Sequence, residues 1–282
     1  MKIIRRITPM QKFSISAKLK KRTIGFVPTM GFLHEGHLSL VRRSKKDNDL
    51  TVVSIFVNPK QFLPNEDFKK YPRDPKRDEH LLSKEKVDIL FCPSENEMYS
   101  TRYLTYVNVE EMAETLCGRF RPGHFKGVTT VVCKLLNIVQ PTTLYLGQKD
   151  AQQAVIINKM IQDLTLPVRV KVLPTVREAD GLAMSSRNIY LSTQERSEAS
   201  VLFRSLKHAE NMITTGQRNP QAVKTAIETI LRENRSAKTD YIECVDAETL
   251  LPVEILKGSI LIVLAVWFGK TRLIDNIKLQ VR

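Results

Sequence analysis

Long apolar runs are scarce in this sequence. The longest, residues 259–268 (SILIVLAVWF), falls well short of the roughly 20 residues that a membrane-spanning helix needs, so it predicts a buried strand. The first residues, MKIIRRITPMQKF, carry positive charge but no apolar core of secretory length, and no small-residue cleavage pattern follows them. We therefore expect a cytoplasmic protein that does not bind membranes.

Closely spaced cysteines are also absent. Cys92, Cys117, Cys133 and Cys244 are widely scattered, without the pairing of a metal knuckle or the density of a disulfide scaffold. We expect reduced, mostly buried thiols.

Acidic residues are too few to balance the basic ones. The chain has 44 Lys and Arg against 30 Asp and Glu, a formal net charge of +14, which suits a polyanion such as nucleic acid or nucleotide phosphate. The basic residues occur in short groups, at 18–22, 42–46 and 69–77, and no zinc-finger, leucine-zipper or aromatic RNA-binding signature accompanies them. A solvated surface is the alternative for each group, and we expect no nucleic-acid partner.

Apolar segments rich in β-branched residues alternate with segments of helical period over the first 174 residues. The expected strands are residues 23–28, 51–57, 87–92, 143–147 and 168–173, and the expected helices are residues 38–46, 78–86, 129–139 and 151–164. This alternation predicts an α/β fold with a Rossmann-like, doubly wound parallel sheet, whose ligands lie at the C-terminal ends of the strands.

The pattern changes after Pro174. Helices are expected at residues 194–212 and 220–234, and strands near 240–245 and 259–268. A chain of 282 residues is long enough for two domains. We expect a Rossmann-like domain of residues 1–174 and a smaller C-terminal α+β domain of residues 175–282.

The segment HEGH, residues 34–37, places two imidazoles three residues apart at the start of a helix, so both face one side. Gly31 permits a tight turn and Gly36 lacks a side chain, so phosphate could approach the helix N-terminus. His34 and His37 could then donate hydrogen bonds to charge developing on an α-phosphate. HEGH lacks the HExxH spacing of zinc proteases. Histidines that only cap the helix remain the alternative.

Two later segments offer groups for the same ligand. GQKDAQQ, residues 147–153, follows a predicted strand; Lys149 could bind a β- or γ-phosphate, and Gln153 lies one turn further along. Asp150 could either cap the next helix or accept from a ribose hydroxyl. MSSRN, residues 184–188, has two hydroxyls and a guanidinium that suit a phosphate chain, with a helix-capping serine as the alternative.

Together these segments resemble the nucleotidyltransferase superfamily with HIGH-type and KMSKS-type motifs, and within it the pantothenate synthetase family. The motifs that carry the resemblance follow one another in the order PTMGFLHEGHLSLV (28–41), FVNPKQF (56–62), YPRD (71–74), RPGHFKGVTTVV (121–132), GQKDAQQ (147–153), READGLAMSSRNIYLS (177–192) and WFGKTRLIDN (267–276). Mild departures are Phe32, where a small residue is usual, and Gln148, where Glu is common.

The resemblance implies a two-step ATP-dependent reaction. Pantoate attacks the α-phosphate of ATP to give pantoyl adenylate and pyrophosphate, and β-alanine then displaces AMP to give pantothenate. It further implies a homodimer, a first domain that binds nucleotide and pantoate, and a C-terminal domain that closes over the ATP site. Mg²⁺ should accompany ATP, held chiefly by phosphate oxygens. Asp78 is a candidate indirect metal ligand.

The resemblance also implies roles for individual residues. The residues expected to bind ATP are Met30, Gly31, Phe32, Leu33, His34, Glu35, Gly36, His37, Gly147, Gln148, Lys149, Asp150, Val176, Met184, Ser185, Ser186 and Arg187. Those expected to act in catalysis are His37, the favoured acid or transition-state stabiliser, and His34, Lys149, Ser185, Ser186 and Arg187. Gln61 and Gln153 should bind pantoate, with Asn58 and His124 nearby, and Gln61 should also border the β-alanine pocket. Residues 61–73 are expected to form a moving cover.

Two other functions remain open. One is another adenylate-forming nucleotidyltransferase of the same fold, including an enzyme that charges tRNA, although no anticodon-binding domain is evident in 282 residues. The other is a basic nucleic-acid-binding protein with a vestigial ATP site. Against it, the groups of HEGH, Lys149 and residues 185–187 are intact.

Overall fold

The computed structural model describes residues 1–64 and 66–282, which divide by their internal contacts into two compact units. Unit 1 consists of Met1–Glu114, Gly118–Gly147 and Ile156–Pro174, and unit 2 consists of Thr115–Cys117, Gln148–Val155 and Thr175–Arg282. The assignment of residues 1–174 and 175–282 to separate domains stays a prediction. Within the described residues, none of the helices combines the length and the apolar character needed to cross a membrane.

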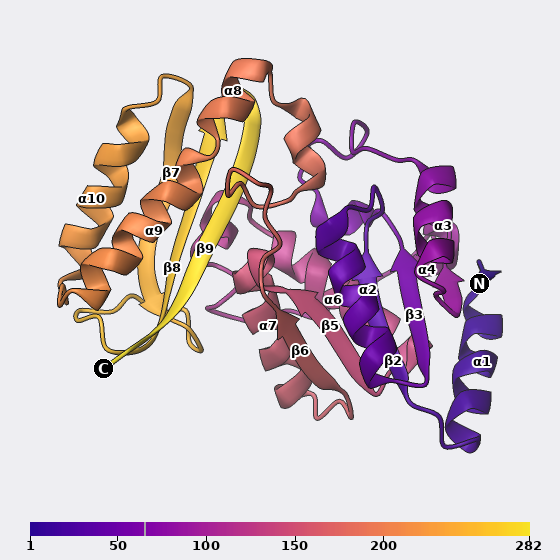
Figure 1. The fold of residues 1–282 in the computed structure, drawn as a ribbon. Helices are drawn as coiled ribbons and strands as arrows, with labels where there is room; N and C mark the ends of the chain where they lie inside the picture. The colour runs from indigo at the N-terminus through magenta and orange to yellow at the C-terminus, as the bar shows by residue number, and fades with distance from the viewer. Residues whose placement is uncertain (65) are drawn as a thin grey trace. The chain divides into compact units, whose positions relative to one another are not determined.

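Unit 1 contains a six-stranded, fully parallel sheet (Figure 1). In spatial order its strands are β1 (Lys2–Ile4), β4 (Ile89–Phe91), β3 (Leu50–Ile55), β2 (Ile24–Thr29), β5 (Thr143–Gly147) and β6 (Arg169–Leu173). The central strands are apolar along nearly their whole length, and Phe26, Val53 and Leu144 are fully buried. Burial on both faces explains why these strands read as continuous apolar runs in the sequence.

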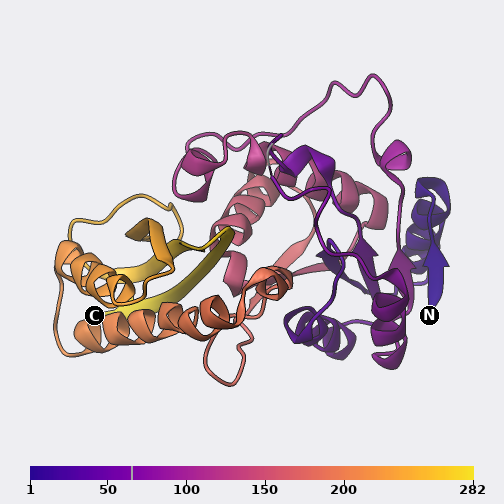
Figure 2. The same ribbon diagram turned by 90° about the horizontal axis from the view of Figure 1, so that it is seen from above.

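Helices cover both faces of this sheet; α2 and α3 lie on one side and α6 on the other (Figure 2). The helices and 3-10 turns in this part of the chain are α1 (Ile7–Leu19), α2 (Glu35–Asp47), η1 (Pro59–Gln61), α3 (Pro75–Lys84), α4 (Glu95–Met98), α5 (Cys117–Phe120), α6 (His124–Val139) and α7 (Ala151–Asp163). The predicted doubly wound α/β fold is therefore confirmed.

The direction of winding reverses between β2 and β5. The chain proceeds from β2 to β3 and β4 on one side, and from β5 to β6 on the other, while β2 and β5 pair directly through Phe26 and Leu144. Ligands of doubly wound sheets bind outside the carboxyl ends of the strands at such a point. β2 ends at Thr29 and β5 at Gly147, so the segment that begins at Met30 leaves the sheet at this edge.

Unit 2 contains a three-stranded antiparallel sheet in the order β7 (Ala237–Asp246), β8 (Gly258–Phe268) and β9 (Thr271–Val281). Its helices and 3-10 turns are η2 (Gln148–Asp150), η3 (Ser186–Tyr190), α8 (Thr193–Glu198), α9 (Val201–Thr214) and α10 (Pro220–Arg232). α9 and α10 pack on one face of the sheet, where Leu206 and Ile227 join Ile262 and Leu264 in a buried core (Figure 1). The predicted α+β character of this part of the chain is thus confirmed.

Several element predictions were incomplete or wrong. β1, α1 and β9 were not predicted. The single helix expected over residues 194–212 is two helices, because α8 ends at Glu198 and α9 begins at Val201, with a turn in which the Ser200 hydroxyl donates to the Ser197 carbonyl. α3 begins at Pro75 rather than at residue 78, because the Asp74 carboxylate caps it by accepting from the Arg77 amide.

Candidate functional site

The loop between β2 and α2 has an unusual backbone. Gly31 has φ +86° and Phe32 has φ +50°, so two successive residues adopt the left-handed region that non-glycine residues seldom occupy. The Phe32 ring lies under the Arg77 guanidinium, 5.1 Å from its centroid. A loop of this shape needs partners outside itself, because it has no ladder of neighbouring strands to bind its amides.

Asp78 supplies those partners. Its carboxylate accepts from the Phe32 amide at 2.7 Å and from the Leu33 amide at 2.8 Å, and the residue is only 1% exposed. Burial raises the pKa of Asp78, and the two amide hydrogen bonds offset only part of that effect. Asp78 therefore fixes the loop, a role that the sequence did not suggest for it.

The two histidines of HEGH form a reciprocal cap at the start of α2. His34 Nδ1 accepts from the Gly36 amide at 3.2 Å, and His37 Nδ1 accepts from the His34 amide at 3.3 Å. Because Nδ1 is the acceptor in both rings, the neutral form of each carries its proton on Nε2. The ring centroids lie 4.1 Å apart. The capping alternative is thus observed, and it leaves both Nε2–H groups as the donors of the pair.

Three residues expected near pantoate form a buried hydrogen-bonded group in unit 1. Asn58 Nδ2 donates to Gln61 Oε1 at 3.1 Å, and Gln61 Nε2 donates to the Met30 sulfur at 3.1 Å. His124 Nδ1 donates to the Gln61 carbonyl at 2.7 Å. Tyr99, which sequence reasoning missed, donates its hydroxyl to Asn58 Oδ1 at 2.7 Å. The structure therefore brings these residues together with the loop after β2.

Arg121 extends this group and was also missed as a site residue. Its Nη1 lies 3.1 Å from His124 Nε2, which must accept because Nδ1 carries the proton that His124 donates. Arg121 also binds Glu66 through two nitrogens, at 2.5 and 2.6 Å. Burial raises the pKa of Glu66, but the hydrogen bonds and charge of Arg121 outweigh it and leave that pKa below its usual value. Arg121 stood within the motif RPGHFKGVTTVV, which was the signal for it.

The predicted moving cover, residues 61–73, contains Asn65, which lies outside the described residues. On either side of it, the Phe62 ring packs edge-on against Phe68 and Tyr71, with centroids 5.3 and 5.9 Å away. The Glu66–Arg121 pair ties the same segment to the N-terminal end of α6.

The remaining predicted nucleotide-binding residues belong to unit 2, except Gly147. Lys149 and Asp150 lie in η2, with Lys149 Nζ 3.7 Å from Asp150 Oδ1, and Gln153 lies half-buried in α7. Asn276, another residue not predicted, binds the backbone of η2.

Residues 176–187 form a short hairpin followed by η3. The Met184 amide donates to the Val176 carbonyl at 3.0 Å, and Ser185 Oγ accepts from the Arg187 amide at 3.2 Å, so Ser185 caps η3. Ser186 is buried, and Arg187 is half-buried. The capping alternative for Ser185 is observed, while the phosphate role of this segment stays a prediction.

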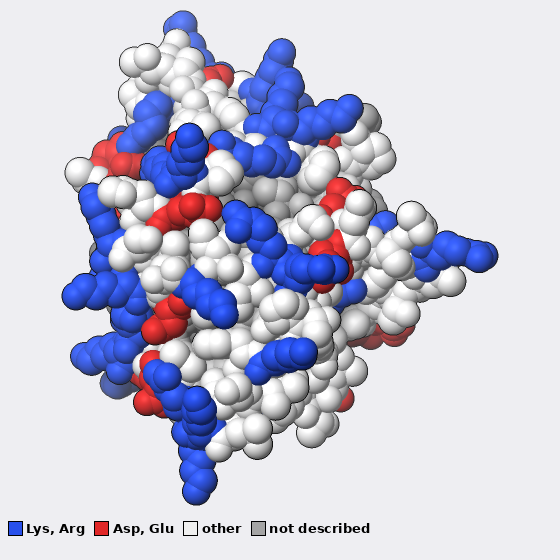
Figure 3. Space-filling model, turned by 90° about the vertical axis from the view of Figure 1, so that its right-hand side faces the viewer, with Lys and Arg blue, Asp and Glu red and all other residues white. Residues whose placement is uncertain are grey.

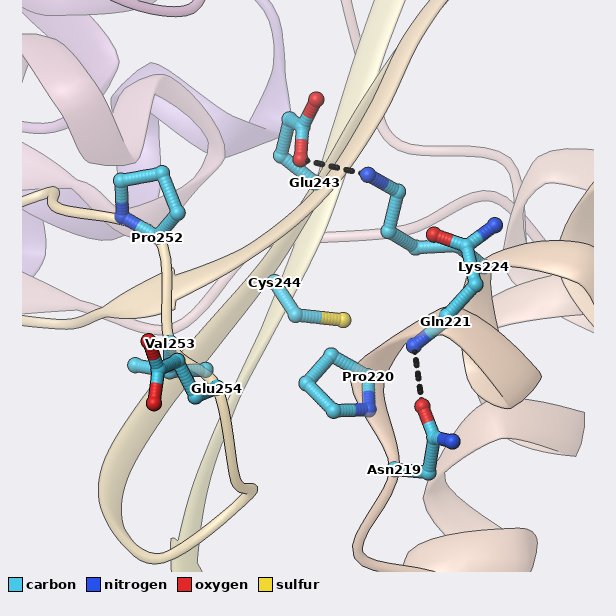
Figure 4. A pocket seen from close by; sticks show the side chains of 9 residues that line it. All are labelled: Asn219, Pro220, Gln221, Lys224, Glu243, Cys244, Pro252, Val253 and Glu254. Carbon is cyan, nitrogen blue, oxygen red and sulfur yellow. Dashed lines mark hydrogen bonds and ion pairs between the residues drawn. The ribbon is translucent and has the colours of Figure 1, made fainter.

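A different pocket of unit 2, of about 240 Å³, contains none of the predicted site residues (Figure 4). Lys224 and Glu243 form an ion pair of 2.8 Å across part of its wall. The Cys244 side chain lies at the centre of this group in Figure 4. Burial raises the pKa of that thiol to about 12, so it stays protonated and is a poor nucleophile.

The surplus positive charge is dispersed. On the face drawn in Figure 3, Lys and Arg side chains are spread among Asp and Glu rather than gathered into one continuous tract. This pattern fits the solvated-surface interpretation of the short basic groups.

Comparison with known proteins gives one consistent result. The family model described as pantoate-beta-alanine ligase matches residues 2–278. The chain is 56% identical over 276 residues to the pantothenate synthetase of Pseudothermotoga lettingae, covering 98% of each chain, and 54% identical over 276 residues to that of Thermotoga petrophila, covering 98% of this chain and 99% of the relative.

Two solved structures agree with this result. The pantothenate synthetase of Thermus thermophilus superposes with a TM-score of 0.93 at 43% identity, covering 98% of this chain and 99% of the other. The pantoate-beta-alanine ligase of Francisella tularensis, complexed with beta-gamma ATP and beta-alanine, superposes with a TM-score of 0.80 at 37% identity, covering 98% of this chain and 97% of the other.

Proposed function

The chain belongs to the pantoate-β-alanine ligase family, and from that premise we propose how its residues perform the reaction. It is a ligase that forms pantothenate from pantoate and β-alanine with ATP as co-substrate. A pantoate carboxylate oxygen attacks the α-phosphorus of ATP, and pyrophosphate leaves with the electrons of the broken P–O bond. The β-alanine amine then attacks the acyl carbon of pantoyl adenylate, loses a proton and releases AMP.

The reciprocal histidine cap is the observation that carries this mechanism. It directs Nε2–H donors from His34 and His37 at the helix start where β2 ends, beside the point at which the sheet's winding reverses. Charge grows on the α-phosphate oxygens during the first step, and preorganised donors stabilise it without reorganising. We assign the main donation to His37 and a supporting one to His34.

Lys149, Ser185, Ser186 and Arg187 are proposed to compensate the charge of the phosphates, and Gly147 to Asp150 with Val176 and Met184 to hold the nucleotide. The ion pair of Lys149 Nζ with the neighbouring Asp150 carboxylate is long, at 3.7 Å. Phosphoryl transfer needs positioning and charge compensation rather than a covalent protein nucleophile, and these side chains supply both.

Gln61 and Gln153 are proposed to orient pantoate, and Gln61 also to border β-alanine. Neutral amides can bind hydroxyl and carboxylate oxygens without introducing a competing charge. Since Asn58 and His124 already bind Gln61, we propose that both act on pantoate through it. A direct contact of either residue with pantoate stays a prediction.

Mg²⁺ is proposed to enter with ATP, on the phosphate oxygens. Within residues 1–64 and 66–282, no three His, Cys, Asp or Glu side chains are grouped as a metal site. Both Asp78 oxygens already accept amide hydrogen bonds, so Asp78 does not fit a direct ligand. A ligand role through water stays a prediction. Homodimer formation and a cytoplasmic location likewise remain expectations from the family, and another adenylate-forming enzyme of this fold remains the competing function.

Isotope exchange between pyrophosphate and ATP tests the proposal. We expect exchange that requires pantoate and does not occur with amino acids. Exchange supported by an amino acid, and not by pantoate, would refute the assignment in favour of the competing function.

Substitution of the proposed donors gives a second test. His37→Ala and Lys149→Ala should each slow single-turnover adenylate formation by about 100-fold to 1000-fold, the usual cost of losing one transition-state donor. His208→Ala and Lys159→Ala remove exposed side chains of the same types and serve as matched controls. Unchanged single-turnover rates in the His37 and Lys149 variants would reject both roles.

A further inference from the structure

The last strand, β9, carries two buried polar residues that the reaction does not use. Asp275 is 1% exposed and Asn276 is 4% exposed, and both belong to the motif WFGKTRLIDN. Consecutive residues of a strand point to opposite faces of the sheet. Asp275 lies between the apolar positions Leu273 and Ile277, which pack against the core beneath α9 and α10, so Asn276 points to the other face. A buried carboxylate among apolar neighbours is costly unless it is paired.

On one face, Asn276 binds η2. Its Nδ2 donates to the Gln148 carbonyl at 3.0 Å and to the Lys149 carbonyl at 2.9 Å, and its Oδ1 accepts from Gln148 Nε2 at 3.0 Å. One side-chain amide therefore makes three hydrogen bonds to a segment of two residues. These bonds leave the Lys149 side chain uninvolved while they fix the backbone that carries it.

On the other face, Asp275 binds the hairpin of residues 176–184. Its two oxygens accept from Arg177 Nη1 at 2.6 Å and from Nη2 at 3.0 Å. The same Arg177 donates to the Gly181 carbonyl at 3.0 Å, and its guanidinium lies 4.0 Å from the centroid of the Phe203 ring. A paired guanidinium and carboxylate are geometrically specific, so this contact sets the position of the hairpin.

The two contacts are also coupled to each other. The Asn276 amide donates to Asp275 Oδ1 at 2.8 Å, and both residues pair with β8, opposite Val263 and Leu264. A buried polar network that is fully hydrogen-bonded rigidifies its surroundings.

We propose that Asp275 and Asn276 are positioning residues for ATP, which hold the two nucleotide-binding segments of unit 2 in one fixed arrangement through adjacent positions of β9. The inference rests on the proposed roles of Lys149 and of residues 184–187. Neither Asp275 nor Asn276 needs to touch the nucleotide. Each acts on the backbone or hairpin that presents the groups which do.

Asn276→Ala tests the first half. It should lower kcat/KM for ATP by about 100-fold, the order of loss that follows from displacing a positioned group by about 1 Å. The KM for pantoate at saturating ATP should change little, which a general loss of structure would not achieve. Gln280→Ala, on the same strand and face but exposed, is the matched control. If Asn276→Ala does not fold, Asn276→Ser keeps one donor and should show a smaller loss of the same kind.

A double-mutant cycle separates positioning from an independent contribution. If Asn276 acts through η2, the Lys149→Ala/Asn276→Ala protein should lose less activity than the product of the two single losses. A loss equal to the full product would overturn the proposal, and so would an Asn276→Ala protein with unchanged ATP kinetics beside an impaired Lys149→Ala protein. If Lys149→Ala itself has no effect, the ATP assignment fails, and this inference fails with it.

Hydrogen exchange distinguishes the two residues without reference to activity. Asn276→Ala should speed amide exchange in residues 148–153, and Asp275→Asn should speed it in residues 176–184. Equal acceleration of both segments in both variants would indicate general destabilisation and contradict the division of roles.

Discussion

The Asp78→Asn substitution should loosen the loop after β2 while changing almost no volume. The carboxylate of Asp78 has two acceptor oxygens, which bind the Phe32 and Leu33 amides at 2.7 and 2.8 Å. An asparagine offers one acceptor and one amide donor, so one of the two backbone N–H groups would face another donor. The loop cannot easily adapt, since Gly31 and Phe32 are held at positive φ.

The expected cost follows from the lost bond. A buried donor left without a partner costs about 1–3 kcal/mol, and hydrogen bonds to a charged acceptor lie toward the upper end of the usual range. The substitution also removes the penalty of burying the carboxylate, which raises the pKa of Asp78 and makes the upper limit unreachable. We expect the free energy of unfolding to fall by about 1–2 kcal/mol. The KM for ATP should rise, because His34 continues this loop.

The pH dependence has a definite sign. Because burial raises the pKa of folded Asp78 above its ordinary value, the stability that this group contributes is largest below that ordinary value. It decreases as the pH rises through the raised pKa. The difference in stability between the parent protein and Asp78→Asn should therefore narrow over that interval.

Urea unfolding and pyrophosphate exchange at varied ATP measure these effects, with Glu79→Gln as a control on the same helix, where the side chain is 37% exposed. Equal unfolding free energies and equal ATP KM values would refute the positioning role. A changed Mg²⁺ half-saturation with unchanged ATP KM would instead support Asp78 as an indirect metal ligand.

Two further substitutions test the group around Gln61. Gly127→Ala should destabilise the fold by about 1–3 kcal/mol in calorimetry, the usual cost of overpacking, because a Cβ there would lie 2.1 Å from the Lys60 carbonyl oxygen. Glu66→Gln should cost about 2 kcal/mol at neutral pH, by loss of a charge-assisted contact with Arg121. Since the folded pKa of Glu66 is lowered, this contribution is present above the ordinary carboxyl pKa and lost on acidification, so the two proteins should converge in acid denaturation curves.

The predictable part of the fold is the part whose strands are apolar throughout. β3 and β5 are buried on both faces, and their sequences show it directly. α1 escaped prediction because its buried face consists of Met10, Ser14 and Ala17, which give too weak an apolar period. β9 alternates correctly at Leu273 and its odd-numbered successors, but the charged residues between and among them obscured the pattern.

The site divides in the same way. The residue types and order of HEGH predicted a phosphate-binding helix start and two inward donors, which required only local spacing. The reciprocal cap that leaves Nε2–H as the donor in both rings was not predictable, since it depends on ring orientations. Tyr99 and Glu66 had no sequence signal at all, because each matters only through a partner that the fold brings near.

The residues that hold the proposed site share a physical origin. Asp78 binds amides 45 and 46 positions away, His124 binds a carbonyl 63 positions away, and Asn276 binds carbonyls 127 and 128 positions away. Segments that leave a sheet at the ends of its strands lose the ladder that would satisfy their backbone groups, and buried backbone groups must still be bonded. Distant buried side chains take over that task. A protein that keeps HEGH, GQKD and MSSRN but loses Asp78 or Asn276 should therefore retain every group of the proposed chemistry and still bind ATP poorly.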